Sequence, residues 1–312
     1  MTDRHFDGVR FFNPTHANGQ PVSAVPRMLA QPRAPWPAHV PVTVRRPPPR
    51  DDASAVVTFI GHSTFLIQTP LGTVVTDPVY SERASPVTFA GPRRVRMPAV
   101  DFENLPPISV VLLSHNHYDH CDRRTLRAIE SRWHPLVVTP VGNGRLLKSM
   151  RIGRVEELDW WQDASDSPVP VTLTPAQHFS ARTPFDRNRA LWGGFVVTSG
   201  SRRIFFAGDS GYAPHFTDVR TRCGRLDLAL LPIGAYEPRW FMRDIHMNPE
   251  EAVKAHLDLG ADRSIGMHFG TFQLTLEAID DPVHALDAAR RAHGVAPDAF
   301  RAPDFGESFV LA

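Results

Sequence analysis

The chain has 312 residues, of which 42% are hydrophobic and 21% are charged, a composition that argues against wholesale disorder. Its formal net charge of +1 argues against an extended nucleic-acid-binding surface. The two cysteines, Cys121 and Cys223, cannot build a disulfide framework, which is consistent with a reducing compartment.

The N-terminal segment, MTDRHFDGVRFF, has no apolar run of signal-peptide length, and no stretch of about 18 apolar residues follows it. We therefore expect a cytoplasmic protein. Its positive charge is concentrated in two segments: residues 1–50 carry seven Arg and two Asp, and residues 81–98 carry four Arg and one Glu. These segments could contact the inner face of a membrane or a phosphate group, or be ordinary solvated arginines.

Residues 1–50 also hold ten of the thirty prolines, including the run RRPPPR at residues 45–50. Such a run cannot form regular helix or a central strand. We expect residues 1–50 to be an extended Pro/Arg-rich arm that packs on the body, and residues 51–312 to be one catalytic domain.

Short apolar runs begin the body and predict strands. The runs at residues 56–60, 64–67 and 73–76 indicate a strand meander, with a Pro-Leu-Gly turn before the third. Residues 108–113 are continuously apolar, as in a strand buried on both faces. Four further strands are expected at residues 171–174, 203–207, 226–233 and 264–269.

A helix is expected between the last two of these strands. Asn248 is a suitable N-cap, Pro249 suits the first turn, Glu251 can complete a capping box, and Gly260 can end the helix. Strands in both halves of the chain, with helices among the later ones, predict an α/β four-layer sandwich with helices outside two packed sheets.

The densest group of possible metal ligands, HNHYDH at residues 115–120, follows directly after the run at 108–113. In an extended segment His115 and His117 point the same way, whereas Asp119 and His120 can turn toward a neighbouring point. This spacing indicates two adjacent metal ions with nitrogen and oxygen ligands. The alternative is a His-rich polar loop. Cys121 could add a soft ligand or be a small buried thiol.

One short cluster cannot supply all the ligands of two ions, so the remaining ligands should lie at other strand ends. His178, Asp209 and His268 each follow an expected strand. Each alone could be an ordinary polar residue, but the order cluster, His, Asp, His is specific.

At this point the chain resembles the metallo-β-lactamase superfamily and, within it, the N-acylphosphatidylethanolamine-hydrolysing phospholipase D family. The segments that carry this resemblance are FIGHST at 59–64, TDP at 76–78, RASP at 83–86, GPRR at 91–94, IGAYEPRWFM at 233–242 and HMNPEEA at 246–252. The resemblance implies an αβ/βα sandwich, two zinc ions per chain, and release of N-acylethanolamine and phosphatidic acid.

The resemblance also implies roles for individual residues. It assigns His115, His117 and His178 to one zinc, Asp119, His120 and His268 to the other, and Asp209 to a position between them. Tyr118 and His246 match the substrate-contacting residues of the family. A hydroxide that bridges the ions would attack phosphorus, with Asp119, Asp209 and His246 as the catalytic residues. His246 would anchor the phosphate or protonate the leaving group, and Asp77 and His62 are candidates for orienting a ligand.

Other functions are also compatible with the sequence. The same scaffold could be a soluble metal-dependent lactonase or phosphodiesterase that acts on a small polar substrate, or a lipid-binding scaffold without activity. A di-iron oxidoreductase is disfavoured because it would be expected to carry Glu where His117 stands. The aromatic segments Trp160-Trp161 and Trp240-Phe241-Met242 could form a lipid entrance or belong to the core. The expected partner is a phospholipid substrate and not nucleic acid, and a homodimer is one possible assembly.

Overall fold

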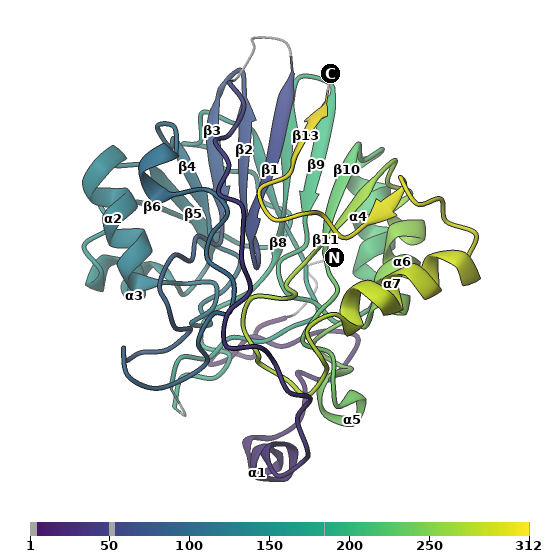
Figure 1. Ribbon diagram of the computed structural model, residues 1–312. Helices are drawn as coiled ribbons and strands as arrows, with labels where there is room; N and C mark the ends of the chain where they lie inside the picture. The colour runs from purple at the N-terminus through teal and green to yellow at the C-terminus, as the bar shows by residue number, and fades with distance from the viewer. Residues whose placement is uncertain (1–4, 50–53, 184, 312) are drawn as a thin grey trace.

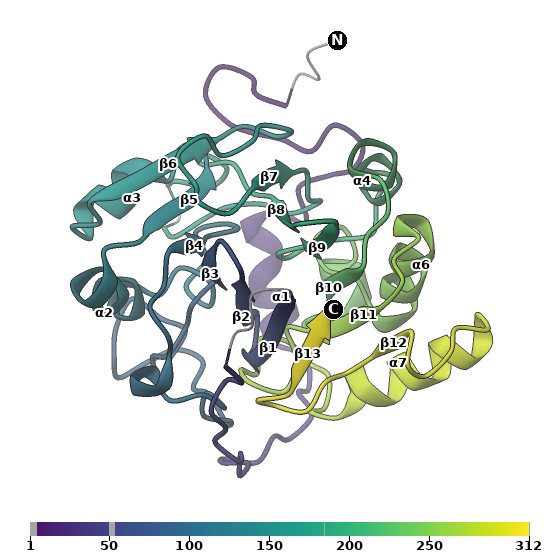
Figure 2. The ribbon, with the colours of Figure 1, turned by 90° about the horizontal axis from the view of Figure 1, so that it is seen from above.

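A computed structural model describes residues 5–49, 54–183 and 185–311. In these ranges two β-sheets pack face to face and helices flank both, as Figure 1 and the view from above in Figure 2 show. This arrangement confirms the predicted four-layer αβ/βα sandwich. No helix in the described ranges is long and apolar enough to cross a membrane.

The first sheet has seven strands in the order β13-β1-β2-β3-β4-β5-β6. An antiparallel meander, β1 to β3, continues into the parallel strands β4 to β6, and β13 pairs with β1. The strands are Ala55–Gly61 (β1), Thr64–Thr69 (β2), Gly72–Thr76 (β3), Val110–Leu112 (β4), Leu136–Pro140 (β5), Arg154–Leu158 (β6) and Ser308–Leu311 (β13). On its outer side lie the helices Arg123–Trp133 (α2) and Gly144–Ser149 (α3).

The second sheet has six strands in the order β12-β11-β10-β9-β8-β7. They are Val171–Thr174 (β7), Gly194–Ser199 (β8), Arg202–Phe206 (β9), Leu228–Pro232 (β10), Ser264–Met267 (β11) and Phe300–Arg301 (β12). The helices His215–Cys223 (α4), Pro249–Leu259 (α6) and Asp281–Ala292 (α7) flank this sheet. Four short helical segments complete the elements of the described ranges: Val22–Ala24 (η1), Val25–Leu29 (α1), Phe102–Asn104 (η2) and Arg239–Met242 (α5).

Alternate residues of the first sheet face two different cores. Phe65 and Val74 join the apolar cluster shared with the second sheet, which includes Phe205. Their neighbours Leu66 and Val75 join a separate cluster under α2 and α3. Because side chains alternate along a strand, burial on both faces requires the continuous apolar runs seen in the sequence.

The predicted helix near residue 248 is α6. Asn248 accepts a hydrogen bond from the backbone N–H of Glu251, whose side chain accepts one from the backbone of Asn248, so the capping box is complete. Gly260 ends the helix in the left-handed conformation, at φ 54°. This helix fixes the backbone directly after His246.

The described part of the arm, residues 5–49, lies along the body but is not extended throughout. It contains the short helix Val25–Leu29 (α1), which the proline content did not predict. Hydrogen bonds tie the arm to the body: Asn13 Nδ2 donates to the His178 carbonyl at 2.8 Å, and Trp36 Nε1 donates to the Glu277 carbonyl at 2.9 Å. Residues 1–4 and 50 of the expected arm, and 51–53 of the expected catalytic domain, lie outside the described ranges.

Candidate metal centre

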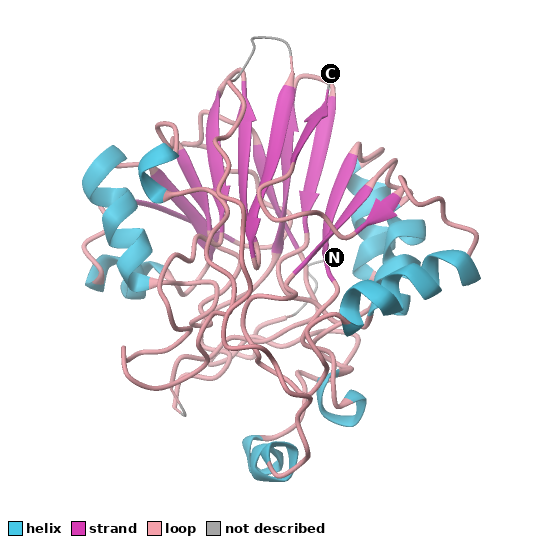
Figure 3. Cartoon of the chain, viewed as in Figure 1, coloured by secondary structure: helices cyan, strands magenta, loops and turns pink. Residues whose placement is uncertain are grey.

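The predicted ligands converge where strands of both sheets end. His115, His178, Asp209 and His268 follow β4, β7, β9 and β11, respectively. These strands have the same direction within each sheet, so their carboxyl ends meet in one region, where loops predominate in Figure 3. His246, in the loop between α5 and α6, lies in the same place.

The first group of ligands consists of His115, His117 and His178. His117 Nδ1 lies 2.9 Å from His115 Nε2 and 3.3 Å from His178 Nε2. The opposite ring nitrogens of two members bind elsewhere: His115 Nδ1 lies 2.9 Å from Ser114 Oγ, and His178 Nδ1 lies 2.9 Å from the Ile245 carbonyl. These outer contacts leave three imidazole nitrogens directed at one point, which is the arrangement a metal ion requires.

The second group brings together Asp119, His120, His268 and His62, whose candidate ligand atoms lie within 4.8 Å of one another. Asp119 Oδ2 lies 3.0 Å from His62 Nε2 and 3.3 Å from His268 Nε2. His62 follows β1 with a positive φ of 55°. His62 is expected from the sequence only to orient a ligand, but its position after a buried strand resembles that of the predicted ligands.

Asp209 lies between the two groups. Its Oδ2 is 3.2 Å from His268 Nε2, 3.8 Å from His178 Nε2 and 3.9 Å from His115 Nε2. Asp209 Oδ2 also lies 3.0 Å from His120 Nε2, whereas Asp209 Oδ1 is buried and has no hydrogen-bond partner among the residues described. An unpartnered buried oxygen is costly unless a ligand satisfies it. Nitrogen and carboxylate donors in this arrangement are ligands that zinc and related metal ions accept, so the residues fit a metal centre.

Asp77, at the end of β3, orients the second group without belonging to it. Its carboxylate accepts hydrogen bonds from Ser114 N at 2.7 Å and Ser114 Oγ at 2.5 Å, and it lies 2.7 Å from His120 Nδ1. Because both oxygens are occupied, Asp77 fixes the ring of His120 and leaves Nε2 directed at the centre.

The electrostatics of the cluster favour ionised carboxylates and divide the imidazoles into neutral ones and two that favour the protonated form. Burial lowers the pKa of His117 to about 3 and that of His178 to about 4. Burial opposes ionisation of Asp209, but neighbouring histidines, His120 first, hold its pKa well below the ordinary value. Burial also opposes charge on His268, yet Asp209 and Asp119 raise its pKa to about 9. Metal binding needs deprotonated ligands. Five of the seven predicted ligands already favour that form, whereas His120 and His268, whose pKa values are raised, would have to lose a proton.

His246 is buried beside the cluster. Its Nε2 lies 3.8 Å from Asp209 Oδ2, while its Nδ1 is buried with no partner in the part of the chain that is described. Burial holds the pKa of His246 well below its usual value, so this imidazole is neutral at neutral pH. The backbone carbonyl of His246 accepts a hydrogen bond from Arg239, which also pairs with Glu251 of α6.

Tyr118 belongs to the turn at residues 115–120, which we call the metal-binding turn, and lies on the face opposite the predicted ligands. Its hydroxyl donates to the Arg182 carbonyl at 3.1 Å, and the Arg182 guanidinium lies 3.9 Å from the centre of its ring. Arg182 Nη1 also donates to the carbonyls of Asn116 and Cys121, at 2.7 and 3.0 Å, and so holds both ends of the turn. The structure thus places Tyr118 beside a neighbouring pocket and does not bring it together with His246.

An apolar cavity of about 180 Å³ opens onto the metal ligands. Beside His117, Asp119, Asp209, His246 and His268, its lining includes Met28, Phe179, Ala235, Phe241, Met242, Ile245 and Leu274. Met28 belongs to α1, so the arm contributes a wall. Of the aromatic segments, Phe241-Met242 reaches this cavity, whereas Trp160 is buried and donates to the Trp192 carbonyl at 2.7 Å.

Cys121 follows the cluster in sequence but joins none of the potential metal-binding groups in the described ranges. It is fully buried, and burial raises the pKa of its thiol to about 11. These observations favour the small buried thiol over the soft ligand.

Comparison with known proteins agrees with this geometry. Residues 73–269 match the model of the Beta-lactamase superfamily domain. N-acyl-phosphatidylethanolamine-hydrolyzing phospholipase D 1 of Caenorhabditis elegans is 36% identical over 82% of this chain and 76% of its own length. An uncharacterized protein of Mycobacterium tuberculosis is 42% identical over 77% of this chain, which spans 65% of that relative's length.

Among solved structures, isothiocyanate hydrolase from Delia radicum gut bacteria superposes with a TM-score of 0.67 at 21% identity, covering 82% of this chain and 99% of that one. At this level of identity the likeness concerns the fold.

Proposed function

We propose that this chain is a two-zinc phosphodiesterase. It belongs to the metallo-β-lactamase superfamily and, within it, to the N-acylphosphatidylethanolamine-hydrolysing phospholipase D family. Its substrate would be an N-acylated phosphatidylethanolamine, and its products phosphatidic acid and N-acylethanolamine. The observation that carries this proposal is that the seven predicted metal ligands lie together, and that several of them line a cavity with an apolar wall.

In this proposal the ligands divide as the resemblance implies. His115, His117 and His178 would hold one ion, Asp119, His120 and His268 would hold the other, and Asp209 would contact both. When bound, the two ions would supply an activated water and offset the charge that develops on the phosphate. The apolar wall that includes Met28 and Phe241 favours a lipid over a small polar substrate.

His246 would then bind the phosphate as a neutral hydrogen-bond donor. Its unpartnered Nδ1 and its lowered pKa support this role over that of an imidazolium acid. Asp119 would bind the second ion together with His120 and His268, and His62, whose Nε2 lies 3.0 Å from Asp119 Oδ2, would orient its carboxylate. Water would add its oxygen to phosphorus, the bond from phosphorus to the ethanolamine oxygen would break, and the departing oxygen would take up a proton.

Tyr118 would contact substrate only where the substrate extends past the turn into the neighbouring pocket. The division into an arm of residues 1–50 and a catalytic domain of residues 51–312 likewise stays a proposal, supported by the contribution of Met28 to the cavity. Peripheral membrane contact and a homodimer belong to the same proposal.

Product analysis tests this function. The purified zinc-loaded protein is incubated with an N-acyl phospholipid and, separately, with a water-soluble lactone, and products are identified by mass spectrometry. We expect phosphatidic acid and N-acylethanolamine from the lipid. Lactone opening without any lipid product would support the soluble-hydrolase alternative instead.

A variant that carries both His115→Ala and Asp209→Ala is the control, because it lacks two predicted metal ligands and should no longer bind metal. A hydrolase loses all turnover, because the bridging and one terminal ligand are gone. A lipid-binding scaffold would lose metal yet keep its affinity for vesicles, and the wild type would then show no turnover at all.

A further inference from the structure

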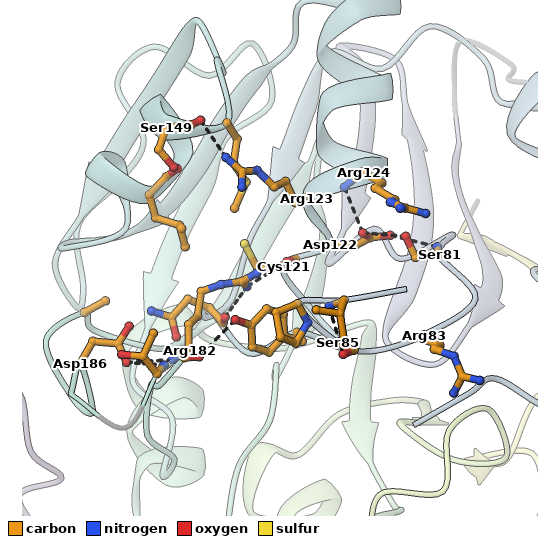
Figure 4. A pocket seen from close by; sticks show the side chains of 18 of the residues that line it. Ser81, Arg83, Ser85, Cys121, Asp122, Arg123, Arg124, Ser149, Arg182 and Asp186 are labelled. Atoms are coloured by element: carbon orange, nitrogen blue, oxygen red, sulfur yellow. Dashed lines mark hydrogen bonds between the residues drawn. The ribbon is translucent and has the colours of Figure 1, made fainter. Parts of the chain in front are cut away.

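The metal-binding turn separates two different cavities. Its side chains alternate: His115, His117 and Asp119 face the metal centre, whereas Asn116 and Tyr118 line a pocket of about 680 Å³ on the other side. Figure 4 shows this second pocket, which we call the arginine pocket. It lies between α2, α3, the loop from residue 81 and the loop from residue 182.

Positive charge dominates the arginine pocket. Six arginines line it against three carboxylates, with Arg83, Arg123, Arg124, Arg145, Arg182 and Arg189 on the basic side. In Figure 4 the side chain of Arg123 points toward Ser149 and that of Arg182 toward Cys121. Ser81, Ser85 and Ser149 add hydroxyl groups to the lining.

The three carboxylates offset only part of this charge, and each is already held by groups other than the side chains of the lining arginines. Glu82 pairs with Arg93, which is not a lining residue. Asp122 caps α2 and accepts hydrogen bonds from Ser81 N and Oγ, both at 2.9 Å. Asp186 accepts from the backbone N–H of Arg182 at 3.0 Å.

Three of the arginines keep their donors available. The guanidinium groups of Arg124, Arg145 and Arg189 form no hydrogen bond or ion pair in the ranges that the structure describes, and all three side chains are exposed. By contrast, Arg123 donates to the Ser149 carbonyl at 3.1 Å, and Arg182 is held by the turn. An anion in the pocket would therefore meet unpaired guanidinium groups above a preformed wall.

We propose that the arginine pocket binds the doubly charged phosphate of a phosphomonoester, at a site separate from the metal centre. Guanidinium groups match the oxygens of phosphate, and several unpaired positive charges favour a dianion over the single charge of a phosphodiester. The ligand would be either the headgroup of an acidic lipid or a soluble phosphomonoester. This inference does not depend on the proposed hydrolase activity.

Calorimetric titration with glycerol 3-phosphate tests the proposal on the metal-loaded protein. The pocket variant, Arg124→Ser with Arg145→Ser, is compared with Arg127→Ser plus Arg154→Ser, which removes two exposed arginines outside the lining. Losing hydrogen bonds from a charged donor weakens binding about tenfold or more. We expect that loss in the pocket variant and unchanged affinity in the control variant.

Two further arms make the result specific. The His115→Ala plus Asp209→Ala protein should retain the pocket's affinity for glycerol 3-phosphate even if it has no turnover, which separates this site from the metals. Flotation with phosphatidylcholine vesicles that contain phosphatidic acid identifies the source: pocket-dependent flotation indicates a lipid headgroup, and titration without it indicates a soluble ligand. Equal affinity of the pocket and control variants for glycerol 3-phosphate would overturn the proposal.

Discussion

Asp77 illustrates how a buried carboxylate can orient a predicted metal ligand. It joins the end of β3 to Ser114 and to His120 Nδ1. A metal-bound imidazole usually depends on such an acceptor for its orientation and basicity. The pattern of a carboxylate after a buried strand was visible in the sequence, but its partner, His120, is 43 residues away and became evident only in the structure.

The substitution Asp77→Asn tests this role. It keeps the shape of the side chain but removes the charge opposite His120, so we expect metal affinity to fall about 10- to 100-fold. Competition with a chelator measures this loss for each ion. Asp227→Asn, at a buried carboxylate that pairs with Arg202 and belongs to none of the candidate metal-binding groups in the described ranges, is the control and should leave metal affinity unchanged. Equal metal affinity in both variants would contradict the assignment.

Elements with a clear local signal could be predicted from the sequence, whereas α1 could not. The meander and α6 follow from alternation and from a capping box, which are local signals. The helix α1 lies in a proline-rich segment and buries Met28 against the body, so tertiary contact decides its conformation. The same contact makes the arm part of the cavity.

A pair of adjacent residues on α1 tests the arm. Met28 is 8% exposed and lines the cavity, whereas Leu29 is 53% exposed. Met28→Asp places a charge against the apolar wall and should raise KM for the lipid about tenfold, from a loss of one to three kcal/mol of apolar contact. Leu29→Asp makes the same change on the exposed side. Steady-state kinetics that show equal effects for both, or none for Met28→Asp, would exclude the arm from substrate binding.

The whole molecule concentrates buried histidines, and their protonation links stability to pH. The folded pKa values of His117, His178 and His215 are lowered to about 3, 4 and 3, chiefly by burial. Below the ordinary pKa of about 6.5 these histidines are protonated in the unfolded chain but stay neutral in the folded chain. The free energy of unfolding therefore decreases as the pH falls toward their folded pKa values. His268 acts oppositely: its contribution is fully present below about 6.5 and is lost as the pH rises through about 9.

We therefore expect the free energy of unfolding of the chelated protein, measured by urea titration, to decrease between about pH 6.5 and about pH 4.5. Each histidine with a lowered folded pKa would contribute up to about 1.4 kcal/mol per pH unit. His215→Gln isolates one of them outside the metal cluster and should flatten this pH dependence. His39→Gln, at an exposed residue, should not change it. If both variants match the wild type at every pH, burial of His215 does not contribute.

The two packed sheets of the whole molecule could be predicted from the sequence, but the order of their strands could not. Four of the predicted ligands, His115, His178, Asp209 and His268, each follow a strand, which is why they converge. The sequence did not predict that the turn at residues 115–120 lies between two cavities. Tyr118 alternates with the ligands, so its position across from the metals is consistent with strand periodicity, but only the loop carrying Arg182 shows what it contacts. Distant segments such as this loop, some 64 residues from Tyr118, are not specified by local pattern.

The most direct test of the two-metal phosphodiesterase is to measure lipid hydrolysis while zinc is added back to the chelated protein. We predict that turnover of N-acylphosphatidylethanolamine to phosphatidic acid and N-acylethanolamine rises with bound zinc and reaches its maximum at two ions per chain. Lipid turnover by metal-free protein, or no lipid product from protein that has bound two zinc ions, would contradict the account.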